Sequence, residues 1–266
     1  MKYKANIGVF GGSGFYSFLD DVQELTIDTP YGAPSDKIAI AEIHNKKVAF
    51  LPRHGKDHRL PPHMINYRAN LYAMKQLGVT RIIGPCAAGS LQPHVKPGDF
   101  VICNQFAHRT WGRRDTFYDG PSTTHIGGAE PYCPEMRELA IKSAKKMGIS
   151  VHETGTVVVI QGPRFSTKAE SQEFSSLGWE VINMTQYPEA ILARELEICY
   201  TNISLITDYD AGLEGNPDVE AVSHEMVIKV FNENLDNLRK VLIDIIKEIP
   251  DERSCICSNA LETARL

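Results

Sequence analysis

Two carboxylates near the end of one apolar run are well suited to acid–base chemistry. Asp208 and Asp210 follow the run Ile203–Ile206, which has the pattern of a buried strand. If the strand continues through them, positions i and i+2 place both side chains on one face. Carboxylates that close together interact, so one can hold a raised pKa and keep its proton. A protonated carboxyl can donate to a heterocyclic nitrogen, and an ionised neighbour can accept from an exocyclic amine.

Cationic and hydroxyl side chains follow two other predicted strands. Arg53 and His54 come after the run Lys46–Leu51, and Ser13 lies in the glycine-rich turn that follows Asn6–Phe10. Such groups can bind a dianion such as phosphate. A solvated basic loop explains Arg53 and His54 equally well. The turn matches neither a dinucleotide-binding fingerprint nor a P-loop, so it is a weak signal alone.

Small and apolar residues stand at the remaining strand ends. Phe165 and Ser166 follow one predicted strand, Met184 and Thr185 follow another, and Ala87 ends a third. An aromatic ring and a thioether make a surface on which a flat ring can stack. Ligands of open α/β sheets bind just outside the strand ends. The anion site, the apolar slot and the paired acids together suggest a nucleoside whose glycosidic bond is attacked by phosphate.

Strands and helices alternate along the chain, which predicts an α/β fold with a central sheet. Predicted strands cover Asn6–Phe10, Lys37–Ile43, Lys46–Leu51, Arg81–Ala88, Gly98–Phe106, Thr156–Ile160 and Ile203–Ile206, and predicted helices cover Met64–Leu77, Pro134–Met147 and 219–249. The polar loop that ends near Cys133 is long enough to be functional or interfacial. No linker divides the chain, so we expect one domain over residues 1–250 and a tail over 251–266.

Bulk properties exclude several classes of protein. The 266 residues carry a net charge of -5 without a basic run, which argues against nucleic-acid binding. No apolar stretch reaches the roughly 18 residues of a spanning helix. The first residues contain too short an apolar run for a signal peptide. We therefore expect a cytoplasmic protein that does not bind membranes.

The six cysteines raise the question of redox state. No CxxC pair is present, which argues against a zinc ribbon, and reduced thiols are the ordinary state in a cytoplasmic protein. Cys255 and Cys257 are the exception, because they lie in a polar tail where no core needs them. A disulfide between them would close a tight ring, and strained bridges are easily reduced.

Nine segments in this order resemble the trimeric purine nucleoside phosphorylase family, and within it the methylthioadenosine phosphorylases. They are GGSG (11–14), TPYGAPSD (29–36), RHGKDH (53–58), NYRAN (66–70), AEPYCP (129–134), QGPRFS (161–166), INMT (182–185), PEA (188–190) and TDYD (207–210). They span about 200 residues, and GPRFS, NMT and TDYD are highly specific. The resemblance implies a mixed-sheet phosphorylase fold and a homo-oligomer, either a trimer or a dimer of trimers. It also implies phosphorolysis of S-methyl-5′-thioadenosine to adenine and 5-methylthioribose 1-phosphate.

The family's binding residues can be placed on this chain by their motifs. The resemblance implies a phosphate site at Ser13, Arg53, His54, Cys86, Ala87 and Thr185, with Cys86 where relatives often carry threonine. It implies a purine site at Phe165, Ser166, Asp208 and Asp210, with Met184 against the ribose. His125, in the long polar loop, would reach the 5′ pocket of a neighbouring subunit.

The implied mechanism needs phosphate as co-substrate and no metal or other cofactor. Phosphate captures an oxocarbenium-like sugar at C1′ while the leaving adenine gains a proton or strong hydrogen bond at N7. We assign Asp208 to N7 and Asp210 to the 6-amino group, and the two roles could be exchanged. Relatives that cleave 6-oxopurines carry asparagine where Asp208 stands. A nucleosidase that uses water and a non-catalytic nucleoside-binding protein are the competing functions.

The 5′ specificity has two interpretations. Methylthio-specific relatives usually place a small apolar residue where His224 stands, whereas 6-oxopurine nucleoside phosphorylases use a histidine there to bind the 5′-hydroxyl. His224 could equally well only line the start of the last helix. Val227 and Ile228 supply apolar surface for a methylthio group. Methylthioadenosine is therefore the expected first substrate, with adenosine and other purine nucleosides as alternatives.

The CxC tail resembles that of methylthioadenosine phosphorylases from hyperthermophiles. That resemblance implies a bridge between Cys133 and Cys199 and another between Cys255 and Cys257. The further tail cysteine of those relatives is replaced here by Ser258. A reducing cytosol would oppose both bridges.

Overall fold

One mixed sheet organises the protein. The structure, a computed structural model, describes residues 4–11, 22–211, 219 and 222–264. Its strands are β1 (Ile7–Gly11), β2 (Gln23–Leu25), β3 (Ile38–Ile43), β4 (Lys46–Pro52), β5 (Arg81–Ser90), β6 (Phe100–Val101), β7 (Gln105–Arg109), β8 (Val151–His152), β9 (Thr156–Ile160), β10 (Val181–Asn183) and β11 (Cys199–Asp208). They form an eleven-stranded sheet with the order β2-β3-β4-β1-β5-β10-β9-β7, and β11, β6 and β8 branch from β5.

The sheet is mixed, as the sequence predicted. β1 is parallel to β4 and β5, and β5 is parallel to β11. β3 and β4, which were both predicted as strands, form an antiparallel hairpin, and β10 runs antiparallel to β5. β5 and β11 are buried along nearly their whole length, as expected of central strands that are covered on both faces.

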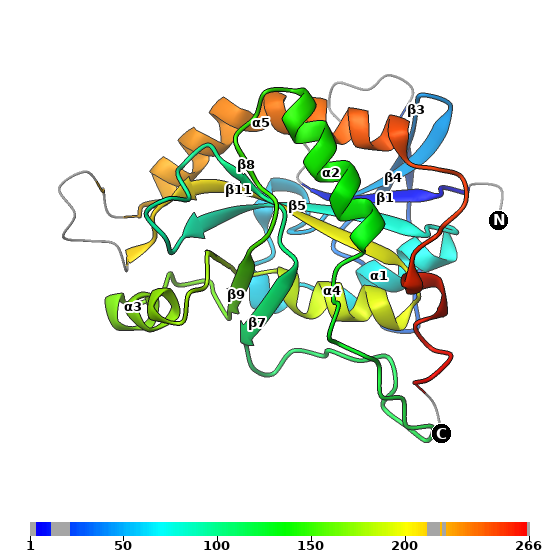
Figure 1. Ribbon diagram of the computed structural model, residues 1–266. Coiled ribbons are helices and arrows are strands. Elements are labelled where there is room, and N and C mark those ends of the chain that lie inside the picture. Colours follow the sequence, from blue (N-terminus) through cyan, green and yellow to red (C-terminus); the bar gives the residue numbers. More distant parts are fainter. Residues whose placement is uncertain (1–3, 12–21, 212–218, 220–221, 265–266) are drawn as a thin grey trace.

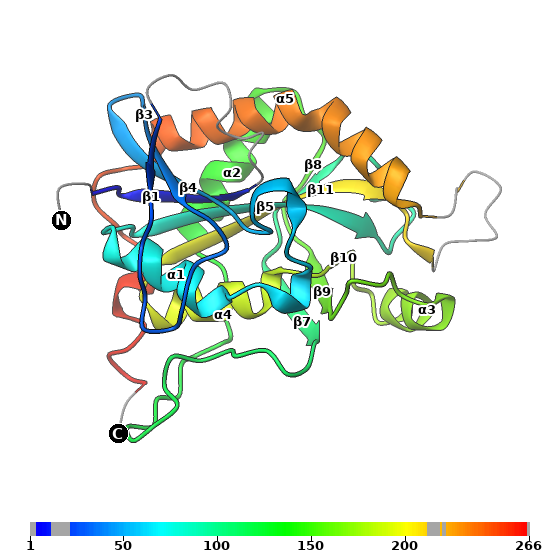
Figure 2. The same ribbon diagram turned by 180° about the vertical axis from the view of Figure 1, so that it is seen from behind.

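Helices cover both faces of the sheet. They are α1 (Tyr67–Gln76), α2 (Pro134–Lys146), α3 (Lys168–Ser176), α4 (Gln186–Glu195) and α5 (His224–Glu248). Figure 1 shows α2 and α5 on one face and α1 and α4 on the other, and Figure 2 shows the same layers from behind. Each face has its own apolar cluster, so the sheet lies between two cores. This arrangement confirms the α/β class and the single domain.

Local signals explain where the helices begin and end. Thr167 and Glu170 form a capping box at the start of α3, and Ser223 accepts from the backbone N–H of Met226 at the start of α5. Gly78 and Gly148 follow α1 and α2 with positive φ, as expected of residues that stop a helix. The last helix begins at His224, five residues after the predicted start.

The predicted strand Gly98–Phe106 is wrong, because two strands with different neighbours occupy that stretch. β6 pairs with β11 and β8, whereas β7 pairs with β9. Between them the chain leaves the sheet, and Arg137 of α2 donates from Nε to the carbonyl oxygen of Cys103 at 3.0 Å. A side chain on a distant helix thus satisfies the backbone at this break, and no local pattern could reveal it.

The expectation that no core needs the tail cysteines is also wrong. Ile256–Asn259 form a short 3₁₀ helix, and the Cys257 side chain is 3% exposed within the core beneath α2 and α5. Among the described residues, no helix is long and apolar enough to cross a membrane.

Candidate active site

Strand β5 brings the candidate residues together. On one side, Ala87 pairs with Leu205 of β11, and two residues further along Gly89 pairs with Asp208. On the other side, β10 runs antiparallel, so the chain that leaves Asn183 returns alongside β5 toward Ala87. Met184 and Thr185 come directly after Asn183. The register thus places the predicted phosphate and purine residues on both sides of the same end of β5.

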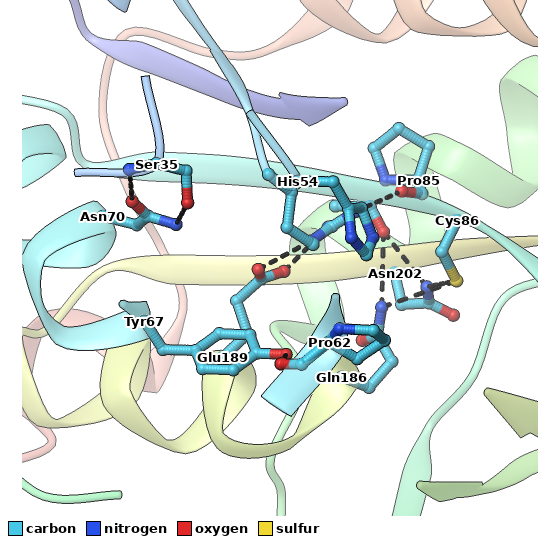
Figure 3. Close-up of polar contacts among 12 residues, drawn as sticks. Ser35, His54, Pro62, Tyr67, Asn70, Pro85, Cys86, Gln186, Glu189 and Asn202 are labelled. Carbon is cyan, nitrogen blue, oxygen red and sulfur yellow. Dashed lines mark hydrogen bonds and ion pairs between the residues drawn. The ribbon is translucent and has the colours of Figure 1, made fainter. Parts of the chain in front are cut away.

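Arg53 is fixed by a buried carboxylate that the sequence analysis did not assign. Its Nε and Nη2 each donate to Glu189 of α4 at 2.8 Å, and Nη1 donates to the carbonyl oxygen of Pro85 at 3.1 Å. Figure 3 labels Glu189 and Pro85 and marks these hydrogen bonds with dashed lines. Tyr200 also donates to Glu189, at 2.5 Å. The guanidinium is therefore held by α4 and β5, and Tyr200 of β11 in turn holds Glu189.

Arg53 keeps its positive charge and has N–H donors that these contacts do not use. Burial alone would lower the pKa of Arg53, but the Glu189 carboxylate outweighs burial and raises it. A guanidinium carries five N–H groups. Three of them make the hydrogen bonds above, which leaves two for an anion. The guanidinium of Arg53 is thus a cation whose orientation is fixed by Glu189 and Pro85.

His54 is neutral in this environment. Its Nδ1 lies 2.9 Å from the carbonyl oxygen of Leu60, which can only accept, so Nδ1 carries the ring proton. Burial, and then the neighbouring His58, lowers the pKa of His54 to about 3. The two rings stack with centroids 4.1 Å apart. Nε2 therefore has a free lone pair, which can accept from a protonated phosphate oxygen.

Cys86 lies among carboxamide groups. The Nδ2 atoms of Asn183 and Asn202 are 3.3 Å and 3.4 Å from its sulfur, and Nε2 of Gln186 is 3.8 Å away. Figure 3 shows Asn202 and Gln186 pointing toward this side chain. The sulfur is here an acceptor of N–H groups, whereas a threonine at this position would be expected to donate. Ala87, the next residue, is likewise half-buried.

Asp208 ends β11 with its carboxylate buried. Its side chain is 4% exposed and accepts from Thr207 Oγ1 at 2.8 Å and from the backbone N–H of Asp210 at 2.9 Å. Burial raises the pKa of Asp208. A Cβ on Gly89, the residue paired with it, would come within 2.9 Å of Asp208 Oδ1. The glycine in β5 therefore makes room for this carboxylate.

Asp210 has left the strand and has different partners. Its φ of 49° is left-handed, so the i, i+2 argument that placed both carboxylates on one strand face is wrong. Ser166 Oγ donates to its carboxylate at 2.7 Å, and Ser171 Oγ also donates to it. These two hydroxyl donors orient the carboxylate. The carboxylates lie close together because the backbone turns back on itself after Asp208.

The apolar residues of the predicted purine site lie near the same turn. Phe165 directly precedes Ser166 and is 39% exposed. Met184 is half-buried, and its sulfur lies where a Cβ on Gly162 would stand. Thr185 is buried and stands at the start of α4, the helix that carries Glu189.

The residues predicted for the 5′ end lie on the first two turns of α5. His224 and Ile228 are exposed and Val227 is half-buried. His224 is close enough to His58 to lower the pKa of His58, after the effect of burial. A cavity of 510 Å³ separates these turns from the end of β11. It is lined by Pro97, Thr207, Asp208, Tyr209, Ser223, Glu225, Met226, Lys229, Val230 and Glu233.

Two residues predicted for the active site are not seen beside the other candidate residues. Ser13 lies outside the described residues. His125 is exposed in the long loop, and its backbone N–H donates to the carbonyl oxygen of Ala264 in the tail at 2.8 Å. In Figure 1 this green loop lies beside the C-terminal end of the chain, on the opposite side from α3 and the end of β11. A role for His125 therefore requires a neighbouring subunit.

Sequence reasoning missed Glu189 and Ser171, although each has a signal. Glu189 interrupts the apolar face that Ala190 and Ala193 form on α4, and a buried carboxylate needs a cation. Ser171 shares the buried face of α3 with Phe174, three residues on. A polar residue on an otherwise apolar helix face is the feature that could have identified both.

All six cysteines are free, so the predicted Cys133–Cys199 and Cys255–Cys257 bridges are not confirmed. The four sulfur atoms nevertheless lie together, all within 4.8 Å of one another. The sequence argument against a metal site is therefore incomplete, because it considered spacing along the chain and not in space.

Comparisons with known proteins identify the family of this chain. A sequence model of the phosphorylase superfamily matches residues 6–247. An S-methyl-5′-thioadenosine phosphorylase of Thermofilum pendens is 51% identical over 98% of each chain. A purine nucleoside phosphorylase of Streptomyces coelicolor is 50% identical over 98% of this chain and 95% of its own.

Solved structures show the same fold. A methylthioadenosine phosphorylase from an Antarctic soil metagenomic library superposes with a TM-score of 0.92 at 39% identity, over 99% of this chain and 93% of that one. The methylthioadenosine phosphorylase of Schistosoma mansoni in complex with adenine gives 0.91 at 34% identity, over 98% and 99%. The chain therefore belongs to the phosphorylase superfamily.

Proposed function

We propose that this protein cleaves S-methyl-5′-thioadenosine with inorganic phosphate, giving adenine and 5-methylthioribose 1-phosphate. The observation that carries the proposal is the presence of two buried groups beside β5, one a cation and the other a carboxylic acid. Arg53 is a buried cation with free N–H groups, and Asp208 is a buried acid whose pKa is raised. Such a pairing suits a reaction in which an anion attacks and a base departs. The names of the relatives from Thermofilum pendens and Schistosoma mansoni support the choice of nucleoside.

In this mechanism a phosphate oxygen forms a bond to C1′ as the bond from C1′ to N9 breaks. Arg53 and His54 hold the phosphate, with Thr185 beside them. The electron pair of the broken bond passes to the adenine, which takes a proton at N7 from Asp208. Asp210, held in place by hydrogen bonds from Ser166 and Ser171, accepts from the 6-amino group. The opposite surroundings of the two acids favour this assignment over its reverse.

The rest of the site receives the base and sugar. Phe165 packs against the adenine ring, Met184 lies against the ribose, and Cys86 and Ala87 border the phosphate. Ser13 would complete the phosphate site. Inorganic phosphate is the co-substrate, and we propose no other cofactor for the reaction.

The active form is proposed to be a homo-oligomer, either a trimer or a dimer of trimers. The exposed loop that carries His125 supports this, because His125 can reach a 5′ pocket only in another subunit. Trp111 in the same loop is 66% exposed, which is unusual for a tryptophan that contacts no partner.

A broader purine nucleoside phosphorylase is the second candidate. The 50% identical Streptomyces coelicolor relative bears that name. His224 at the start of α5 could bind a 5′-hydroxyl, which favours adenosine as an additional substrate.

The decisive experiment measures adenine and sugar products with and without added phosphate. Phosphate-free protein should release no adenine, and phosphate should give adenine and a sugar 1-phosphate in equal amounts. Asp208→Asn serves as the reference for impaired chemistry. Free sugar released without phosphate would identify a nucleosidase, and binding without turnover would identify a non-catalytic protein.

A further inference from the structure

Four cysteines from three separate parts of the chain meet at one buried point. Cys133 is the cap residue of α2, Cys199 is the first residue of β11, and Cys255 and Cys257 belong to the tail. Their sulfur atoms all lie within 4.8 Å of one another. Cys133, Cys199 and Cys257 are buried and Cys255 is half-buried.

The spacing of the sulfurs suits a tetrahedral metal site. Zinc binds thiolates at about 2.3 Å, so the sulfurs of a four-cysteine site lie about 3.8 Å apart. Cys199 and Cys255 are separated by 3.3 Å, and no pair is bonded. This short contact joins one residue from each of the two predicted bridges. The sulfurs therefore form one group of four and not two separate pairs.

Cationic side chains near the four cysteines can balance the negative charge that a four-thiolate zinc site would carry. Four thiolates and one Zn²⁺ carry a net charge of -2, which needs nearby cations. Arg81 pairs with Cys199 across β5 and β11, and Arg253 precedes Cys255 by two residues. Arg81 also lies 3.6 Å from Glu135, but its Nε is buried without a hydrogen-bond partner among the described residues. The N-terminus of α2, where Cys133 stands, adds its favourable dipole.

We propose that Cys133, Cys199, Cys255 and Cys257 bind one structural zinc ion through four thiolates. All four positions are filled by protein, as is typical of structural zinc sites. The ion would fasten the tail to α2 and β11. The tail in turn contacts the loop that carries His125, through the hydrogen bond from His125 to Ala264. The site thus lies outside the phosphorylase chemistry but supports a loop proposed to act in a neighbouring subunit.

The test uses the full-length chain, reduced and freed of metal under anaerobic conditions, with six reactive thiols counted after denaturation. Titration with Co²⁺ should give the strong thiolate charge-transfer bands and visible bands of tetrahedral sulfur coordination. Zn²⁺ should displace the cobalt at one ion per chain and raise Tm.

Three variants locate the site. Cys257→Ser and Cys133→Ser should lose stoichiometric zinc, the tetrahedral cobalt spectrum and the zinc-dependent rise in Tm. Cys257→Ser changes only the tail, so it remains informative if Cys133→Ser folds poorly. Cys103→Ser is the matched control, because Cys103 is buried but bonds to Ser204, outside the group. It should bind zinc like the native chain.

Two results would overturn the proposal. One is a reduced native chain that takes up no stoichiometric zinc, whether or not air oxidation then joins these cysteines as disulfides. The other is zinc uptake that survives in Cys257→Ser and Cys133→Ser alike.

Discussion

Asp208 and Asp210 lie two residues apart but have opposite surroundings. Asp208 is buried at the strand end, and burial raises its pKa. Asp210 accepts hydrogen bonds from two serine hydroxyls, which fix the orientation of its carboxylate. One residue is thus suited to donate a proton and its neighbour to accept a hydrogen bond, which is the division of roles that base recognition needs.

The first prediction concerns base specificity. In Asp208→Asn, asparagine cannot give a proton to N7, but its N–H group can donate to a neighbouring 6-oxo group, so the variant should shift in preference toward 6-oxopurine nucleosides. A site built around one hydrogen bond discriminates by roughly 10²-fold or more when mismatched. The ratio of kcat/KM for adenosine to that for inosine should fall accordingly. Asp99→Asn, a buried carboxylate bonded to His152, is the control. An unchanged ratio in Asp208→Asn would rule out the assignment.

The second prediction concerns stability and pH. Because the folded pKa of Asp208 is raised, the folded chain holds a proton that the unfolded chain has already released in the interval between the two pKa values. The free energy of unfolding therefore falls as pH rises through that interval. Asp208→Asn should remove this loss and have a higher Tm than the native protein at neutral pH, with a smaller difference at acidic pH. A variant less stable at neutral pH would contradict the argument.

The third prediction concerns the 5′ substituent. His224 is the first residue of α5 and is exposed. In His224→Val, loss of a hydrogen bond of roughly 1–3 kcal/mol should lower kcat/KM for adenosine by about 5- to 150-fold. Methylthioadenosine should be cleaved as well as before or better. His63→Val replaces another exposed histidine and should change neither. Equal losses on both substrates would show that His224 is structural.

At the scale of elements, periodicity predicted the buried strands and the helices that cover them. β4, β9 and α2 begin and end within about two residues of their predicted bounds. The glycines that end α1 and α2 were equally visible. These elements were predictable because their bounds depend on local side chains and caps.

Features that depend on residues far apart in the sequence could not be predicted from local patterns. The break between β6 and β7 is stabilised by Arg137, and the partner of Arg53 is Glu189 in α4. The meeting of Cys133, Cys199 and the tail cysteines also depends on tertiary contacts. Asp208 and Asp210 were found from the sequence, but the turn that brings them together was not. Sequence reasoning therefore found residues with chemical capacity better than it found what orients them.

The fourth prediction tests the orienting role of α4. Glu189→Gln places an amide N–H group against Arg53 or Tyr200, which both donate to Glu189. Breaking a buried ion pair costs about 3–5 kcal/mol, so the free energy of unfolding should fall by that order. The KM for phosphate should rise while the KM for the nucleoside changes little.

The matched control for Glu189→Gln lies on the same helix. Glu195 is also buried, and it accepts from Thr116 Oγ1 at 2.8 Å and from the backbone N–H of Phe117 at 2.7 Å. Glu195→Gln should lower stability without a selective effect on phosphate. If the two variants raise the KM for phosphate equally, Glu189 does not act through Arg53.

At the scale of the whole molecule, one chain does not gather all its candidate residues. The sheet brings Arg53 and Asp208 to one edge, whereas His125 lies beside the tail. A closed ring of subunits would place this loop against the next chain. The complete site is therefore expected only in an oligomer, and sedimentation should detect a trimer or a dimer of trimers.

The last prediction tests whether sites are shared between subunits. His125→Ala should lower kcat/KM for methylthioadenosine by about 5- to 150-fold, through loss of one contact. Asp208→Asn impairs the other half of the site. In mixed oligomers of the two variants, a site with Asp208 from one chain and His125 from its neighbour is intact. Random assembly of a ring at equal amounts makes about a quarter of the sites intact, so activity should recover to that order. A mixture no more active than the mean of the two separate variants would show that each chain builds its site alone.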